Sequence, residues 1–216
     1  KNTDEADDML TVVTSFYPMY IAALNIVDKV EGVRLENLSE PQTGCLHDFQ
    51  LTPEDMKLLS TADVFVINGG GIESFMSDVA KAYPKLDVVE ACEDVALLSE
   101  DADTESESNH DHDHDADTES DSNHDHDHDH DHGDENAHAW MSVPRYRTMV
   151  KTIASHLAQK DEAHAKEYYA NAEKYDAKLA VLEEKIDSLK SLTGGQNIII
   201  FHEAYEYVAD DFSMNA

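Results

Sequence analysis

Residues 52–71 read TPEDMKLLSTADVFVINGGG and predict a helix, a strand and a tight turn in succession. Thr52 is a helix-capping residue, and Pro53 suits the first helical turn. The acids Glu54 and Asp55 complement the positive end of the helix dipole. The short apolar run DVFVI predicts a strand buried on both faces, and three glycines then turn the chain. A doubly buried strand between helices is typical of a parallel α/β sheet.

The segments on either side continue this alternation. We expect further strands at residues 10–16, 33–38, 86–91 and 197–201, and further helices from Pro18 and at 72–83, 144–159, 162–192 and 203–211. The helix at 162–192 would span roughly 45 Å, long enough to connect two lobes. The predicted fold is α/β, with a parallel-sheet N-terminal lobe, a long connecting helix and the start of a second α/β lobe.

The charge of the 216-residue chain is −32 and is spread unevenly. Residues 99–136 hold seventeen Asp or Glu and no Lys or Arg. This sign argues against nucleic acid or an anionic membrane surface as a partner and suits a partner that is itself a cation. No apolar run in the sequence approaches the roughly 20 residues of a membrane helix.

The acidic segment contains an internal duplication and most of the histidines. DADTESESNHDHDH, from Asp101, is followed by DADTESDSNHDHDH, from Asp115. With almost no apolar residues the segment cannot offset its ordering entropy, so we expect it to be disordered without metal. Its histidines are accessory metal ligands in this interpretation: His110, His112, His114, His124, His126, His128, His130 and His132.

Three histidines outside the tract occupy equivalent places in the predicted fold. His47 follows the strand at 33–38, His138 lies before the helix at 144–159, and His202 directly follows the strand at 197–201. Ligands bind outside the carboxyl ends of parallel strands, so these side chains can converge. Each alone is more often structural, but together they predict a metal site. Three imidazoles favour Zn²⁺, whereas Mn²⁺ sites more often include carboxylates and water.

Four stretches resemble the solute-binding receptors of high-affinity zinc and manganese ABC importers, the ZnuA-type family. They are GCLHDFQLTPEDMKLLSTADVFVINGGGIESFM, the His/Asp-rich loop, NAHAWMSVPRY and IIIFHEAYEYVADDF. The resemblance covers almost the whole chain from Leu10. It implies that His47, His138 and His202 bind the metal, and that the loop marks a zinc-specific member. It further implies a receptor, not an enzyme, that captures Zn²⁺ outside the cytoplasm and delivers it to a membrane permease.

The resembled family carries a second lobe beyond the third histidine, with a carboxylate that commonly completes the site. We therefore expect a tether, an N-terminal lobe with an insertion, a helical segment and the start of a truncated C-terminal lobe, at 1–9, 10–143 (insertion 99–136), 144–193 and 194–216. The fourth ligand would come from the lobe that the chain lacks. We expect a monomer, periplasmic or lipid-anchored at the cell surface.

Several alternatives stay open. An extracellular metal buffer or adhesin would use the tract as its main binding element, and a manganese receptor would use the same three histidines. A zinc hydrolase is disfavoured because HEAYEY lacks the second histidine of His-Glu-x-x-His. The tract itself is either a zinc-scavenging antenna or a neutral insertion. Cys45 and Cys92 either form a disulfide or are two small buried residues.

Overall fold

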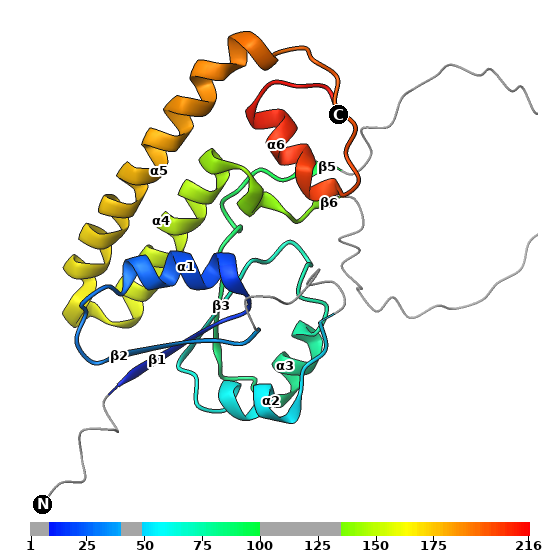
Figure 1. Cartoon of the computed structure of the whole chain (residues 1–216). Helices are drawn as coiled ribbons and strands as arrows, with labels where there is room; N and C mark the ends of the chain where they lie inside the picture. Colours follow the sequence, from blue (N-terminus) through cyan, green and yellow to red (C-terminus); the bar gives the residue numbers. More distant parts are fainter. Residues whose placement is uncertain (1–8, 40–48, 100–134) are drawn as a thin grey trace, which may run out of the picture.

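The computed structural model describes residues 9–39, 49–99 and 135–216 (Figure 1). Its first elements are β1 (Leu10–Thr14), α1 (Tyr17–Ile26), β2 (Val33–Asn37), α2 (Pro53–Leu59), β3 (Val64–Ile67), α3 (Met76–Ala82), β4 (Asp87–Glu90) and β5 (Leu98–Ser99). The remaining elements are β6 (Glu135–Asn136), the 3-10 turn η2 (Ala139–Met141), α4 (Val143–Lys160), η3 (Glu162–His164), α5 (Ala165–Thr193), η4 (Glu203–Tyr205) and α6 (Glu206–Asp211). Strands β1 to β4 form a parallel sheet in the order β2-β1-β3-β4. The predicted α/β class, with a parallel sheet and a long helix, is confirmed.

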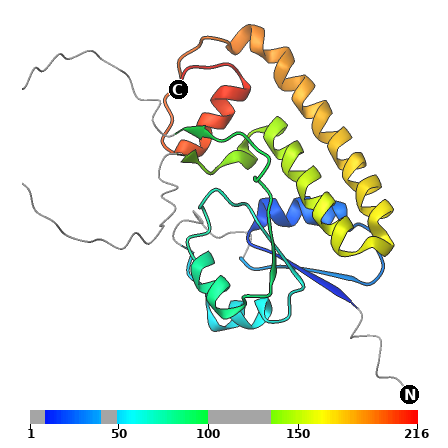
Figure 2. The same ribbon diagram turned by 180° about the vertical axis from the view of Figure 1, so that it is seen from behind.

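Helices cover both faces of the sheet, as the apolar run DVFVI predicts. Val12 and Val66 pack into the cluster that includes residues of α1, α4 and α5. Val13 and Phe65 point the other way, into a cluster with residues of α2 and α3. All four side chains are fully buried. Figures 1 and 2 show the same layering, with α1, α4 and α5 on one side of the sheet and α2 and α3 on the other.

The start of α2 has the capping geometry that its sequence predicts. Asp55 N donates to Thr52 Oγ1 (3.2 Å), and Thr52 N donates to Asp55 Oδ2 (2.8 Å). The two residues thus satisfy each other's backbone donors in a capping box, and Pro53 occupies the first helical position. This start directs α2 back along the sheet toward β3.

The turn after β3 is built on glycine and on one buried carboxylate. Gly69 and Gly70 have φ angles of +83° and +62°, which side chains rarely adopt. A Cβ on Gly70 would lie 3.3 Å from Ala137 Cβ, so glycine lets the segment before His138 approach. The carboxylate of Glu73 accepts hydrogen bonds from Asn68 N (2.7 Å), Gly69 N (3.1 Å) and Ser15 Oγ (2.8 Å).

The long helix α5 joins the sheet lobe to the C-terminal segment. Its 29 residues give a length of roughly 45 Å. Its first half packs against α1 and α4 and buries Tyr168 and Ala172. Further along, Asp176 binds Arg147 of α4 (2.6 Å), and Glu183 binds the same guanidinium. The helix thus extends past the sheet lobe and carries the chain to the far side of α4 (Figure 1).

The strand predicted at residues 197–201 is absent, and that prediction is wrong. Only Asn197 pairs, as an isolated parallel bridge with Asn215. Ile199 and Phe201 are 86% and 97% exposed. A strand needs a neighbour to satisfy its backbone groups, and no strand of the described residues runs beside this segment. Apolar composition alone therefore misled the prediction.

Some sequence predictions fall outside the described residues. These are the tether, apart from Met9, and the histidine-rich insertion, apart from Ser99, Glu135 and Asn136. The predicted domain boundaries also stay predictions. Among the residues that the structure describes, no helix is long and apolar enough to cross a membrane.

Glu73 predicts a specific dependence of stability on pH. Burial raises the pKa of Glu73 from 4.5 to about 7, although its three hydrogen-bond donors act in the opposite direction. The folded state therefore retains this proton where the unfolded chain has released it. This retained proton stabilises the folded state in full below pH 4.5. The stabilisation is lost as the pH rises to about 7, and the free energy of unfolding falls by on the order of 3 kcal/mol.

Glu73→Gln stays neutral at every pH and removes this loss. We expect the free energy of unfolding of the wild type, relative to Glu73→Gln, to fall between pH 5 and pH 8. Urea titrations at several pH values measure this difference. Glu184→Gln, at an exposed position of α5, is the matched control and leaves the wild-type profile unchanged. A difference between wild type and Glu73→Gln that does not vary with pH contradicts the prediction.

Candidate metal centre

His138 lies between β6 and the 3-10 turn η2, close to the glycine turn after β3. His138 is 3% exposed. The side chain of Asn136, two residues earlier, accepts from His138 N (3.1 Å), which closes a local turn of the kind that asparagine favours. The ring of Trp140 lies 5.0 Å from the His138 ring and packs edge-on against Phe16. The tryptophan thus forms an apolar wall beside the histidine.

His202 caps the second 3-10 turn, η4. Its Nδ1 accepts a hydrogen bond from Ala204 N (3.1 Å). The side chain is 39% exposed, in contrast to the buried ring of His138. The two rings lie 4.9 Å apart, centroid to centroid, and are perpendicular. Residues 64 positions apart in the sequence therefore meet at one place, although the predicted strand before His202 is absent.

Glu203 joins the two histidines. His138, His202 and Glu203 each offer one ligand atom, and these atoms all lie within 4.8 Å of one another. Glu203 Oε1 is 3.8 Å from His138 Nε2, and Glu203 Oε2 is 3.5 Å from His202 Nδ1. Donors around a tetrahedral zinc ion lie roughly 3.4 Å apart, given bonds of about 2.0–2.1 Å. The widest separation within the group must therefore shrink by up to about 1.4 Å for the three atoms to hold a single ion. Two nitrogens and one oxygen suit Zn²⁺ and also admit Mn²⁺.

Binding of a metal by His202 has a chemical cost inside the protein. The lone pair of its Nδ1 is engaged by Ala204 N. If Nδ1 binds the metal, that lone pair is no longer available to the backbone. If Nε2 binds instead, the neutral ring carries its proton on Nδ1, which then cannot accept. Either mode requires His202 to release the Ala204 hydrogen bond.

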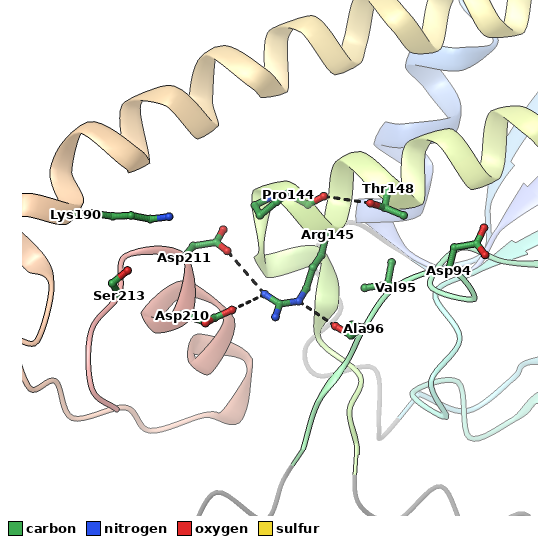
Figure 3. A pocket seen from close by; sticks show the side chains of 10 residues that line it. All are labelled: Asp94, Val95, Ala96, Pro144, Arg145, Thr148, Lys190, Asp210, Asp211 and Ser213. Atoms are coloured by element: carbon green, nitrogen blue, oxygen red, sulfur yellow. Dashed lines mark hydrogen bonds and ion pairs between the residues drawn. The ribbon is translucent and has the colours of Figure 1, made fainter.

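The C-terminal segment that carries these ligands is held against α4 by an arginine. Arg145 binds Asp210 of α6 (2.7 Å) and donates to Ala96 O (3.1 Å). Figure 3 shows these contacts on one side of a cleft of about 570 Å³ between α4, α6 and the end of α5. The guanidinium also stacks over the ring of Tyr207, 4.9 Å from its centroid.

The structure places only part of the predicted site. His138 and His202 lie together. His47, all eight histidines of the tract and Cys45 lie outside the described residues, so their roles stay predictions. Cys92 is a buried free thiol. Its burial, with smaller contributions from Glu90 and Glu73, raises its pKa to about 12, which makes it a poor metal ligand.

Two residues of the centre were missed by sequence reasoning. Glu203 follows His202 directly, but the pair His-Glu was considered only as part of a hydrolase motif. Asn136 gives a weaker signal, an asparagine two residues before a histidine. Both residues act through contacts with a distant segment, so neither spacing nor composition identified them.

Comparisons with known proteins place the chain in a family. The family model described as "Zinc-uptake complex component A periplasmic" matches residues 12–216. The manganese-binding lipoprotein MntA of Halalkalibacterium halodurans is 27% identical over 99% of this chain and 61% of its own length. The zinc-binding protein AdcA of Streptococcus pyogenes serotype M3 is 29% identical over 97% of this chain and 39% of its own length. The chain thus spans less than two thirds of these relatives.

The fold also matches solved structures. The crystal structure of the metal-dependent lipoprotein YcdH from Bacillus subtilis aligns with a TM-score of 0.73 and 22% identity, over 95% of this chain and 65% of that one. At this identity the likeness supports the fold, whereas the match to the family model covers nearly the whole chain. The chain therefore belongs to the ZnuA family, the metal-binding solute receptors, not enzymes, of zinc and manganese ABC importers.

Proposed function

We propose that the chain captures Zn²⁺ outside the cytoplasm and presents it to the permease of an ABC importer. The observation that carries this proposal is the meeting of His138, His202 and Glu203, whose ligand atoms lie within 4.8 Å of one another. The site holds one buried and one half-exposed histidine, so it has a rigid side and an accessible side. Such an arrangement suits an ion that must both enter and leave.

His47 completes the proposed site as a further imidazole ligand, as the family resemblance implies. Zn²⁺ would then have three nitrogens and one carboxylate oxygen, which is a familiar tetrahedral set. Mn²⁺ is the second candidate, because Glu203 supplies an oxygen and one relative is named for manganese. We favour Zn²⁺ because imidazole outnumbers carboxylate in the proposed set.

The described ends of the histidine-rich tract support its proposed role as an antenna. Ser99 pairs with Glu135, and Leu98 pairs with Asn136, in the β5-β6 ladder. Ser99 and Glu135, which flank residues 100–134, therefore lie side by side next to the segment that carries His138. Ions held weakly by a segment tethered at this point would have a high effective concentration at the centre. A location in the periplasm, or on a lipid anchor at the cell surface, fits this role and is part of the proposal.

Substitution of the ligands tests the centre. We expect His138→Ala and His202→Ala each to weaken Zn²⁺ binding by roughly 100-fold or more, because loss of a ligand exceeds the effect of losing a supporting hydrogen bond. Glu203→Gln, which loses the carboxylate charge, should weaken it less. Competition titrations with a zinc chelator measure the tight site separately from weak sites.

His156→Ala is the control for the histidine substitutions. His156 lies on α4 and binds Glu93 (2.7 Å), away from the centre. It should leave the tight site unchanged. Tight binding that survives both His138→Ala and His202→Ala would place the ion elsewhere and reject the proposed centre.

Removal of the tract separates a receptor from a metal buffer. Residues 100–134 are replaced by a loop of about four residues, which closes the β5-β6 pair as a hairpin and keeps Asn136 in place. We expect one tight Zn²⁺ site of unchanged affinity and the loss of weak sites, measured by calorimetric titration with Zn²⁺ and Mn²⁺. If no tight site remains, the chain is a buffer in which the tract is the binding element. Preference for Mn²⁺ in both proteins would support the manganese alternative.

A further inference from the structure

Asn136 connects the two segments that carry the proposed ligands. Asn136 is fully buried. Its Nδ2 donates to Glu203 O (2.9 Å) and to Glu206 Oε2 (3.0 Å), both in the C-terminal segment. Its Oδ1 faces the opposite way, toward His138, where it contacts the backbone N (3.1 Å) and the ring Nδ1 (2.9 Å). One side chain therefore contacts the histidine on one side and the residues around Glu203 on the other.

The orientation of this amide is determined by its partners. A carbonyl oxygen and a carboxylate oxygen can only accept hydrogen bonds, so the group facing Glu203 and Glu206 must be the NH₂. The oxygen of Asn136 must then face His138, whose backbone N–H also requires an acceptor. The assignment of nitrogen and oxygen is thus derived from four contacts and not from the amide alone.

This orientation selects one tautomer of His138. An amide oxygen accepts only, so the neutral ring that binds it carries its proton on Nδ1. Nε2 is then unprotonated, which is the state that a metal ligand requires. Nε2 is also the atom that faces Glu203, at 3.8 Å from Oε1. The contact with Asn136 therefore prepares the ring nitrogen on the side where the other ligands lie.

The backbone around Asn136 is fixed from three directions. Tyr207 Oη donates to Asn136 O and accepts from Leu98 N (3.0 Å). Asn68, at the end of β3, donates through Nδ2 to Ala137 O (2.9 Å). The β5-β6 pair, the sheet lobe and α6 therefore all contact residues 136 and 137. A side chain held this way cannot turn to follow the His138 ring, so the ring must adapt to it.

We infer that Asn136 is a positioning residue that sets the tautomer of His138 and fixes the separation between His138 and Glu203. The inference deepens the proposed function and rests on it for the identity of the ligands. The tautomer, however, exists in the metal-free protein. It can be measured whether or not zinc is the physiological ion.

Two substitutions separate the two roles of the amide. Asn136→Asp keeps an acceptor toward His138 but cannot donate to Glu203 O, and it brings a second carboxylate to Glu206. Asn136→Ala removes both contacts. Glu206→Ala is the matched control, because it removes one partner of the amide and leaves the contact with His138 intact.

The tautomer is read from the ¹⁵N chemical shifts of the ring nitrogens in the full metal-free chain, above the pH at which histidine is neutral. The His138 signals are assigned by their loss in His138→Ala. We expect a proton on Nδ1 in the wild type, Asn136→Asp and Glu206→Ala. Asn136→Ala should give a mixture of the two tautomers. A purely structural role would lower the melting temperature without this change.

Zinc affinity completes the test. Asn136→Ala and Asn136→Asp should both weaken the tight site by roughly 10- to 100-fold, as loss of a supporting hydrogen bond does at metal sites. The inference is overturned if the His138 ring of the wild type carries its proton on Nε2. It is also overturned if Asn136→Ala keeps a single Nδ1 tautomer and binds zinc with unchanged affinity.

If Asn136→Ala does not fold, Asn136→Asp decides the question. In that variant, either a ring protonated on Nε2 or an unchanged zinc affinity overturns the inference. Failure of the proposed function gives a different result, because the wild type itself would then bind no zinc. The tautomer measurements would be unaffected.

Discussion

The centre depends on the docking of α6 against the first turn of α4. Asp211, at the end of α6, accepts hydrogen bonds from Ser142 Oγ (2.7 Å) and Val143 N (2.8 Å). It therefore caps α4 from a segment 68 positions later in the chain. Burial raises the pKa of Asp211, while these two bonds and the nearby Arg145 act in the opposite direction. Together with the contacts from Asn136 to Glu203 and Glu206, this cap holds the segment that carries His202 beside His138.

The docking also explains why the site survives the loss of a predicted element. The segment before His202 was expected to be a buried strand that places the histidine at a sheet edge. In the structure, Phe201 is almost completely exposed, and the position of His202 is set instead by η4 and α6 behind it. His202 thus lies beside His138 for a reason that the sequence pattern did not contain.

Predictability followed the range of the interactions. The capped start at Thr52 and the doubly buried strand around Phe65 depend on neighbours in sequence and on burial periodicity, so the sheet lobe could be predicted. The pairing of β5 with β6 and the amide contacts of Asn136 join segments separated by a long insertion, and periodicity carries no information about them. Glu203 belongs to the same class, because its role follows from the position of His138.

The hydrogen bond from Ala204 to His202 links ligand binding to the start of the C-terminal segment. His138 is held by Asn136 with one nitrogen directed toward the centre, whereas His202 uses its Nδ1 to cap η4. Because either mode of ligation breaks that cap, an ion that binds His202 removes one hydrogen bond from the backbone just before α6. On binding an ion, His138 would keep its hydrogen bond to Asn136, whereas His202 would give up the one from Ala204, so the two histidines differ in what an ion has to break.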